Sequence, residues 1–172
     1  VLEAWHAALA GDPVSAFGGI LMSNVAIDLA TAQEIDQIFY EVLIAPAYEP
    51  AALDLLKKKK NRILVQMKKP INQAWNARSI LNGVLVQEKD AFVDTRANLQ
   101  VVTQTQPSET ELEDMIFAAK VVKHTKSNAI VLAKNKQLIG SGTGQTSRID
   151  AMKQAVHKAR SFNFDVHGAV LA

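Results

Sequence analysis

The sequence predicts an α/β protein in which helices and short apolar strands alternate along the chain. Segments with apolar residues at helical spacing are followed by runs rich in β-branched residues, and this alternation is typical of α/β domains. Glycine, proline and asparagine mark most of the breaks between these segments. The 172 residues are 48% hydrophobic, which is enough to bury the core of one ordinary domain.

The first part of the chain is predicted to contain three helices, each leading to a strand. Leu2, Trp5 and Leu9 share one face of the first helix, and Gly11-Asp12-Pro13 ends it. The later helices follow the same apolar period, and the strands are short apolar runs. The expected helices cover residues 1–10, 28–37 and 50–56, and the expected strands cover residues 17–22, 42–45 and 62–67.

The middle of the chain, residues 68–104, has a weaker pattern and no recognisable chemistry. Two pieces resemble strands, residues 79–86 and residues 91–93, and Asn82-Gly83 is a candidate turn within the first of them. Trp75 is expected to lie in a local core.

The last part of the chain is predicted to hold two capped helices around a pair of strands. Ser108 with Glu111, and Ser147 with Asp150, have the spacing of helix N-terminal capping residues. The expected strands cover residues 129–133 and 137–139 on either side of a turn at Asn135-Lys136, and a further apolar run covers residues 168–172.

Three glycines lie between the expected strand at residues 137–139 and the helix capped by Ser147. They are Gly140, Gly142 and Gly144. Glycines allow backbone amides to approach a ligand closely, and a helix N-terminus with Arg148 beside it suits a phosphate or carboxylate. The G-x-G-x-G spacing matches neither a dinucleotide fingerprint nor a P-loop. The residues alone therefore allow either an anion site or a plain turn.

Three blocks of sequence resemble the AICAR transformylase family. The first is DPVSAFGG at residues 12–19, and the second is EVLIAP at residues 41–46. The third comprises KSNAIV at residues 126–131 and GQTSRID at residues 144–150. The blocks occur in the family's order, and the resemblance covers most of residues 4–172. The family is the formyltransferase half of the bifunctional purine-biosynthesis protein that also carries IMP cyclohydrolase.

The resemblance implies a three-layer α-β-α fold with a mixed sheet, like that of the cytidine deaminases but without their zinc. Residues 1–161 are expected to be the central subdomain, truncated at its N-terminal side, and residues 162–172 the first strand of the next subdomain. The family's catalytic Lys-His pair lies upstream of the DPVSAFGG block, so the chain is expected to be an internal part of a larger enzyme and to be inactive alone. Lys123-His124 lies in a different block and is not expected to replace this pair.

The resemblance also implies the reaction and the residues that position its substrates. The formyl group of 10-formyltetrahydrofolate passes to the 5-amino group of AICAR, which gives FAICAR and tetrahydrofolate. The family pattern assigns AICAR binding to Phe17, Gly18, Glu41, Asn128 and Arg148, and folate contact to Ile149.

The residues alone allow plainer interpretations of three of these positions. Phe17 is equally consistent with a core side chain, and Glu41 with a charge at the edge of a strand. The carboxamide of Asn128 can donate and accept hydrogen bonds at once, which suits recognition of a substrate carboxamide, but it is also typical of a turn residue that bonds its own backbone.

Composition argues against several other classes of protein. The chain has no cysteine, which excludes disulfides and is consistent with a reducing compartment, so a cytoplasmic location is expected. No apolar run is long enough for a membrane span. The four histidines show no H-x-x-x-H pair, so no zinc site is expected. The net charge of +2 gives no general attraction to nucleic acid, and the basic run at residues 57–62 is read as a solvated helix end.

The resemblance implies a homodimer whose active sites are shared between subunits. Two other functions remain open. One is a non-catalytic module that binds a phosphoribosyl ligand through the glycine segment and Arg148, and the other is a structural fragment that pairs with the rest of an enzyme.

Overall fold

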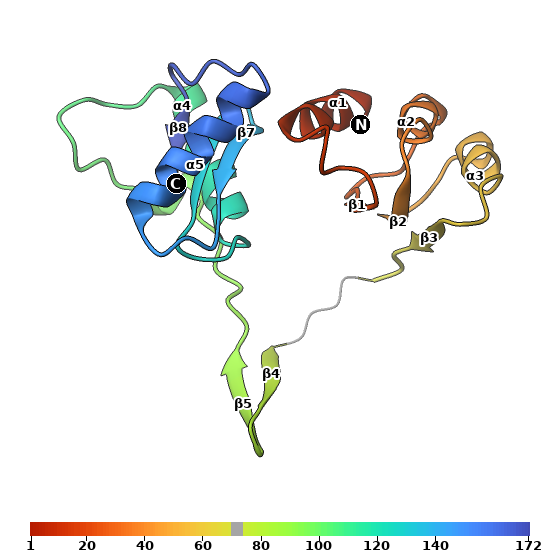
Figure 1. The fold of residues 1–172 in the computed structure, drawn as a ribbon, viewed down its shortest axis with the longest axis horizontal. Helices are drawn as coiled ribbons and strands as arrows, with labels where there is room; N and C mark the ends of the chain where they lie inside the picture. Colours follow the sequence, from red (N-terminus) through yellow and green to blue (C-terminus); the bar gives the residue numbers. More distant parts are fainter. Residues whose placement is uncertain (70–73) are drawn as a thin grey trace.

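The computed structural model describes residues 1–69 and 74–172 and confirms a mixed α/β protein with both parallel and antiparallel sheets (Figure 1). The strands form three separate sheets, in the orders β1-β2-β3, β4-β5 and β7-β6-β8. The family resemblance implied a single mixed sheet. We call residues 1–69 the N-terminal lobe and residues 108–172 the C-terminal lobe; the β4–β5 hairpin and its two connections separate them (Figure 1).

The N-terminal lobe is a parallel sheet with its helices packed on one face. Helix and strand positions follow the sequence prediction closely, and Asp28 caps its helix by accepting a hydrogen bond from Thr31 N at 2.7 Å. Tyr40 and Leu43 of the central strand are buried in the core beneath the helices. The elements are α1 (Leu2–Gly11), β1 (Gly19–Met22), α2 (Leu29–Ile35), β2 (Tyr40–Ala45), α3 (Pro50–Leu56) and β3 (Ile63–Gln66).

The other face of this sheet is apolar and uncovered by any described residue. Ile20, Val42 and Ile63 stand in one row across the three strands, and Met22, Ile44 and Val65 stand in the next. The side chains on the two outer strands are exposed. Alternation along each strand explains this, because neighbouring residues point to opposite faces.

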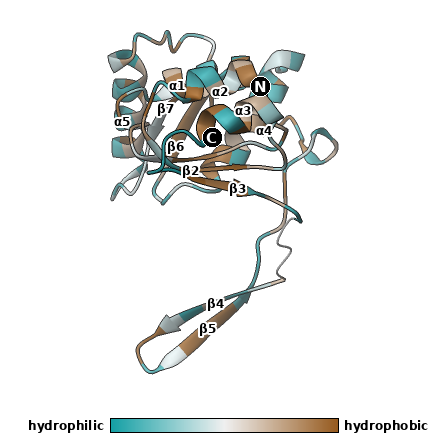
Figure 2. Cartoon of the chain, turned by 90° about the vertical axis from the view of Figure 1, so that its right-hand side faces the viewer, coloured by the Kyte–Doolittle hydropathy of each residue, from teal (hydrophilic) through white to brown (hydrophobic). Residues whose placement is uncertain are grey.

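An isolated hairpin connects the two lobes. Strands β4 (Trp75–Ile80) and β5 (Gly83–Glu88) pair with each other, and every residue in them is exposed. Figures 1 and 2 show the hairpin extending away from both lobes. The hairpin confirms the predicted turn, but the expected core position of Trp75 is wrong, since this side chain is 57% exposed. The expected strand at residues 91–93 is absent, and part of the weakly patterned region, residues 70–73, lies outside the described residues.

The C-terminal lobe has one helix on each face of an antiparallel sheet. Val131 of the central strand packs with Ala118 of α4, whereas Leu132 packs with Ala155 of α5. The predicted Ser108–Glu111 capping box is present at the start of α4. The elements are α4 (Glu109–Val122), β6 (Ile130–Lys134), β7 (Gln137–Gly142), α5 (Arg148–Ser161) and β8 (Val170–Leu171), preceded by a short 3-10 turn (Arg96–Asn98).

The end of the chain belongs to this same sheet in the structure. β8 pairs with β6, so residues 162–172 complete the C-terminal lobe. The subdomain boundary expected after residue 161 stays a prediction. Within the described ranges, no helix has both the length and the apolar character needed to cross a membrane.

Candidate functional site

Three of the predicted AICAR-binding residues gather where the sheet of the N-terminal lobe begins. Gly18 N donates a hydrogen bond to Phe39 O at 2.9 Å, which ties the turn before β1 to the start of β2. Gly18 has a φ of +75°, a conformation that favours glycine. The Phe17 ring lies 5.2 Å from the Phe39 ring and is 73% exposed. This exposure excludes the interpretation of Phe17 as a core side chain.

Glu41 is displayed at the same edge by an irregularity in the strand pairing. Gly19 pairs with Tyr40, but the next residue, Ile20, pairs with Val42. Glu41 is therefore the extra residue of a bulge, and its side chain is exposed. The turn exposes the Phe17 ring, and the bulge exposes the Glu41 carboxylate one residue after the Gly19–Tyr40 pair.

Asn128 lies at the start of β6 and holds the loop that leads into α5. Its Nδ2 donates to Gln145 O at 3.1 Å and to Thr146 O at 3.2 Å, and the backbones of Asn128 and Gln145 exchange two further hydrogen bonds. The Asn128 carboxamide thus bonds a distant loop, whereas the plainer interpretation placed these bonds within its own turn. No hydrogen bond within the described ranges has Asn128 Oδ1 as its acceptor.

Two of the three glycines have a different role from the one that the sequence suggested. Gly140 and Gly142 are buried within β7, directly beneath α5. A Cβ on Gly140 would lie 2.3 Å from Ala155 O, and one on Gly142 would lie 1.9 Å from Ala151 O. These glycines therefore allow a helix to pack closely on a strand and do not cradle a ligand. Gly144 alone of the three is exposed, with a φ of +65°.

The start of α5 presents Arg148 and Ile149 to solvent, directly after the loop that Asn128 holds through Gln145 and Thr146. Ser147 caps the helix as predicted, since its Oγ accepts from Asp150 N at 3.0 Å and donates to Asp150 Oδ2 at 2.7 Å. Asp150 already places a carboxylate at this helix end, so attraction of an anion depends on the exposed Arg148 guanidinium more than on the helix dipole. Ile149 is 65% exposed, which suits contact with an apolar ligand.

The six predicted residues therefore form two groups, one in each lobe. Phe17, Gly18 and Glu41 make up the N-terminal group, and Asn128, Arg148 and Ile149 the C-terminal group. No hydrogen bond or ion pair among the described residues joins a member of one group to a member of the other.

The lysine of Lys123-His124 is paired with residues that precede α4. Lys123 Nζ donates to Phe92 O and pairs with Asp90 Oδ1 at 3.1 Å. This contact lowers the pKa of the Asp90 carboxyl. A lysine held in this way is a poor candidate for a base or a free ammonium donor.

The basic run after α3 is only partly a solvated helix end. Lys59 and Arg62 both pair with Asp36, and the Arg62 side chain is 2% exposed. Arg62 also donates to Asp36 O and Ile38 O and lies 4.3 Å from the centre of the Tyr40 ring. Arg62 is thus a structural cation that joins α2 to β2, and the solvated interpretation holds only for Lys57, Lys58 and Lys60.

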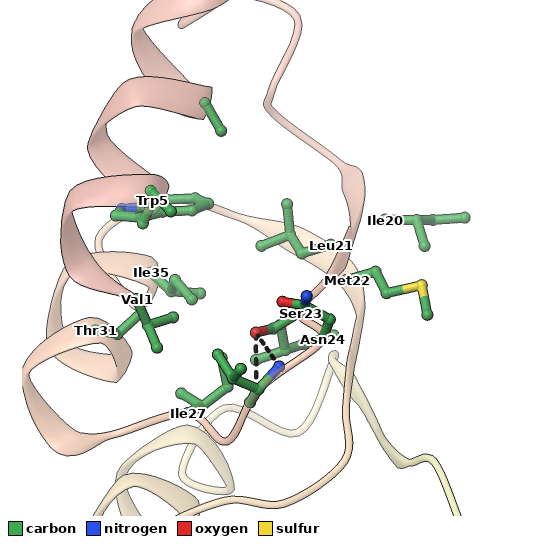
Figure 3. A pocket seen from close by; sticks show the side chains of 14 residues that line it. Val1, Trp5, Ile20, Leu21, Met22, Ser23, Asn24, Ile27, Thr31 and Ile35 are labelled. Atoms are coloured by element: carbon green, nitrogen blue, oxygen red, sulfur yellow. Dashed lines mark hydrogen bonds between the residues drawn. The ribbon is translucent and has the colours of Figure 1, made fainter. Parts of the chain in front are cut away.

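A pocket of about 320 Å³ lies between α1, β1 and α2 (Figure 3). Trp5, Leu21 and Ile27 line it, and it contains none of the six predicted residues. Its lining is largely apolar, so it does not match the charged phosphate and polar base of a ribonucleotide. Across the described ranges, no cluster of three or more histidine, aspartate or glutamate side chains could hold a metal ion.

Sequence reasoning missed two residues that shape the loop before α5. Gln154 Oε1 accepts hydrogen bonds from Thr143 N at 3.0 Å and from Gln145 Nε2 at 3.1 Å, and Gln145 Nε2 also donates to Thr143 O. The two glutamines thereby fix the loop that carries Gly144 and leads to Arg148. A glutamine on a helix has no distinctive sequence signal, because this role depends on a tertiary contact.

Comparison with known protein families identifies the chain's relatives. The family model described as "AICARFT/IMPCHase bienzyme" matches residues 1–158.

The chain belongs to the AICARFT/IMPCHase bienzyme family.

Several curated relatives carry the name "Bifunctional purine biosynthesis protein PurH". The protein of Bacteroides thetaiotaomicron is 58% identical over 172 residues, which cover 100% of this chain and 34% of the relative. The protein of Chlorobium chlorochromatii is 47% identical over 173 residues, and that of Aquifex aeolicus is 46% identical over 172; both matches cover 100% of this chain and 33% of the relative. The chain thus spans about a third of the length of these bienzyme-family relatives. The predicted resemblance is confirmed at the level of the bienzyme family.

Proposed function

We propose that this chain supplies substrate-positioning residues of an AICAR formyltransferase in purine biosynthesis. In a protein as long as the PurH relatives, the formyl group of 10-formyltetrahydrofolate passes to the 5-amino group of AICAR, and the same protein carries IMP cyclohydrolase activity. The observation that supports this most directly is the corner at the start of α5. There Asn128 holds the loop, and Arg148 and Ile149 stand exposed beside it.

The chemistry of this transfer matches the residue types in the two groups. The 5-amino group is a weak nucleophile that must lose a proton as it attacks, and the tetrahedral oxyanion needs hydrogen-bond donors. Arg148 offers a bidentate guanidinium to an anionic group of AICAR, and Asn128 Oδ1 can accept from its carboxamide. The N-terminal group adds the Phe17 ring, the open backbone at Gly18 and the Glu41 carboxylate.

Positioning is the contribution that these residues make in the proposal. The proposal uses the Glu41 carboxylate for binding and assigns no general base to either group, and the family's Lys-His pair has no counterpart in the three matched blocks. Orientation of two reactants can lower a barrier by on the order of 7 kcal/mol or more. We therefore propose that the isolated 172-residue chain binds AICAR weakly and does not transfer the formyl group.

The finer features of the family are part of the same proposal. The helices on both faces of the β7-β6-β8 sheet support a cytidine-deaminase-like three-layer arrangement, at least for the C-terminal lobe. We propose a cytoplasmic homodimer with sites shared between subunits, which would allow the N-terminal group of one copy to meet the C-terminal group of another. Zinc plays no part in this proposed reaction.

Titration of AICAR against wild type and Arg148→Ala tests the proposed function. We expect Arg148→Ala to weaken AICAR binding by about tenfold, because a charge-assisted hydrogen bond of this kind contributes about 1.5 kcal/mol. Arg160→Ala, an exposed arginine on the same helix, is the matched control and should bind as wild type does. Equal affinity of wild type and Arg148→Ala would contradict the assignment.

Formation of tetrahydrofolate separates an enzyme from a binding module. The protein of the relatives' length should produce tetrahydrofolate only when both AICAR and the formyl donor are present. If that protein binds AICAR through Arg148 but transfers nothing, the non-catalytic phosphoribosyl-binding module is the correct function. Formyl transfer by the isolated 172-residue chain would show that the chain contains its own base.

A further inference from the structure

Helix α1 belongs to the N-terminal lobe and also contacts the C-terminal lobe. Its Trp5 side chain packs against the core of the N-terminal lobe, while the helix lies against β7 of the C-terminal lobe (Figure 1). At its end, Gly11 approaches β7 so closely that a Cβ would lie 2.7 Å from Leu138 O. Gln137 Nε2 also donates to Ala7 O at 2.7 Å.

Asp12 immediately follows this helix and uses its two carboxylate oxygens for different contacts. Oδ1 accepts a hydrogen bond from Ser15 N at 2.9 Å, which shapes the turn that leads to Phe17 and Gly18. Oδ2 accepts from Lys158 Nζ on α5. One side chain therefore ties the turn of the N-terminal group to the helix whose first residues belong to the C-terminal group.

Both partners are largely withdrawn from water, with about a third of each side chain exposed. Lys158 also lies 5.5 Å from the centre of the Phe162 ring, which further restricts it. Burial raises the pKa of Asp12, but the bonds from Lys158 and Ser15 outweigh burial, and the net pKa is lowered. The carboxylate is thus charged and paired at neutral pH.

We infer that the Asp12–Lys158 ion pair is a positioning device for AICAR that sets the turn at residues 12–18 relative to α5. This inference rests on the proposed function, because it assumes that Phe17 and Arg148 serve the same substrate. Asp12 and Lys158 touch no substrate in this scheme. They act by holding the residues that do, and a small displacement of such residues can lower kcat/KM for AICAR strongly.

Substitution of Lys158 in a protein of the relatives' length tests the inference through kinetics. Lys158→Met removes the charge and retains much of the chain length, and we expect kcat/KM for AICAR to fall on the order of tenfold, mainly through KM. Lys158→Arg retains the cation and should recover most of the loss. Arg160→Met, two residues away and exposed, should keep the wild-type kcat/KM. A wild-type kcat/KM in Lys158→Met at a temperature where it is fully folded would overturn the inference.

A distance measurement tests the same inference independently of catalysis. The described chain has no cysteine, so Val14→Cys and Lys153→Cys, both at exposed positions, allow spin labels on the turn and on α5. We expect one narrow distance distribution in the parent and a broadened or shifted one with Lys158→Met or Asp12→Asn. Asp12→Asn is a second route because its amide oxygen can still accept from Ser15 N. If the distribution is unchanged in both variants, the ion pair does not set this geometry, whatever reaction the protein catalyses.

Discussion

Asp114 is a single buried carboxylate that holds the predicted turn at Asn135-Lys136. Its side chain is 3% exposed, and it accepts from Asn135 N at 2.8 Å and from Lys136 N at 2.6 Å. Both turn residues have φ of +55°, a conformation that is uncommon for residues other than glycine. The carboxylate from α4 thus stabilises a tight turn between β6 and β7.

Asp114→Ala should lower the free energy of unfolding by about 2 kcal/mol, because two backbone donors lose an ionised acceptor. Urea denaturation of the 172-residue chain measures this. Glu113→Gln is the matched control, since Glu113 is the exposed neighbour that pairs with the Lys136 side chain, and it should change the stability by less than about 1 kcal/mol. Equal losses in the two variants would show that the turn does not need the buried carboxylate.

The Asp36 carboxyl should make the free energy of unfolding depend on pH. Burial raises the pKa of the Asp36 carboxyl, but hydrogen bonds from Lys59 and Arg62 lower this pKa by more than burial raises it. The folded pKa therefore lies below the unfolded one. A depressed carboxyl pKa contributes stability that is present above the unfolded pKa, about 3.9, and is lost as pH falls through the folded pKa.

We expect Asp36→Asn to lower the free energy of unfolding by about 2–3 kcal/mol at pH 7, because the buried Arg62 loses its counter-charge. The difference from wild type should shrink as the pH falls below about 4. Urea denaturation across pH 3–7 checks this, with Asp54→Asn at an exposed helical position as the control. A difference that stays constant over this pH range would contradict the role of the ionised carboxylate.

At the scale of single residues, sequence reasoning succeeded where the signal was local. The caps at Ser108 and Ser147 were predicted because their partners lie three residues away. It failed for Arg62 and Trp75, whose surroundings depend on elements far along the chain. No local pattern distinguishes a lysine-rich helix end from one whose arginine is buried against Asp36.

At the scale of elements, the packing of α5 on β7 explains two glycines more simply than ligand binding does. Gly140 and Gly142 face the backbone oxygens of α5 at distances that leave no space for a side chain. The predicted strand ended at residue 139, but β7 continues to Gly142, because the glycines that seemed to form a loop are part of the strand. Sequence cannot separate these two uses of glycine without knowing which helix lies above.

Gly142→Ala should therefore destabilise the protein by about 3 kcal/mol, since a new Cβ would lie 1.9 Å from Ala151 O and the helix must move. The same shift displaces the first turn of α5 and should weaken AICAR binding. Thermal and urea denaturation measure the first effect, and titration the second. Gly83→Ala is the control, as the nearest atom to its Cβ is 3.8 Å away. A Gly142→Ala protein with wild-type stability would disprove the close packing.

At the scale of the whole molecule, the division into two lobes and a hairpin leaves apolar side chains exposed to solvent. Sequence predicted the order of helices and strands well, but it could not predict that the strands form three sheets. Strand pairing depends on which segments meet in space, and the long connection around the hairpin separates the parallel set from the antiparallel set. The apolar outer face of the N-terminal sheet and the exposed hairpin follow from this separation.

The two tryptophans report on this arrangement. Trp75 is exposed on the hairpin, whereas the Trp5 ring lies against the N-terminal core with its Nε1 buried. Acrylamide should therefore quench Trp75 much more than Trp5 in the 172-residue chain. Trp75→Phe should remove most of the quenchable fluorescence, and Trp5→Phe should leave it. Protection of Trp75 from acrylamide would show that the hairpin packs against another surface.

The central claim is that residues from both lobes contribute to one AICAR site, and Phe17→Ala tests it most directly. Phe17 is exposed and lies in the lobe opposite to Arg148, so its loss should not unfold the protein. In a protein of the relatives' length, we predict that Phe17→Ala weakens AICAR binding by about fivefold, as expected for the loss of an aromatic contact, while Val14→Ala in the same turn binds as wild type does. Wild-type affinity in Phe17→Ala, together with a loss in Arg148→Ala, would contradict a shared site and confine AICAR to the C-terminal lobe.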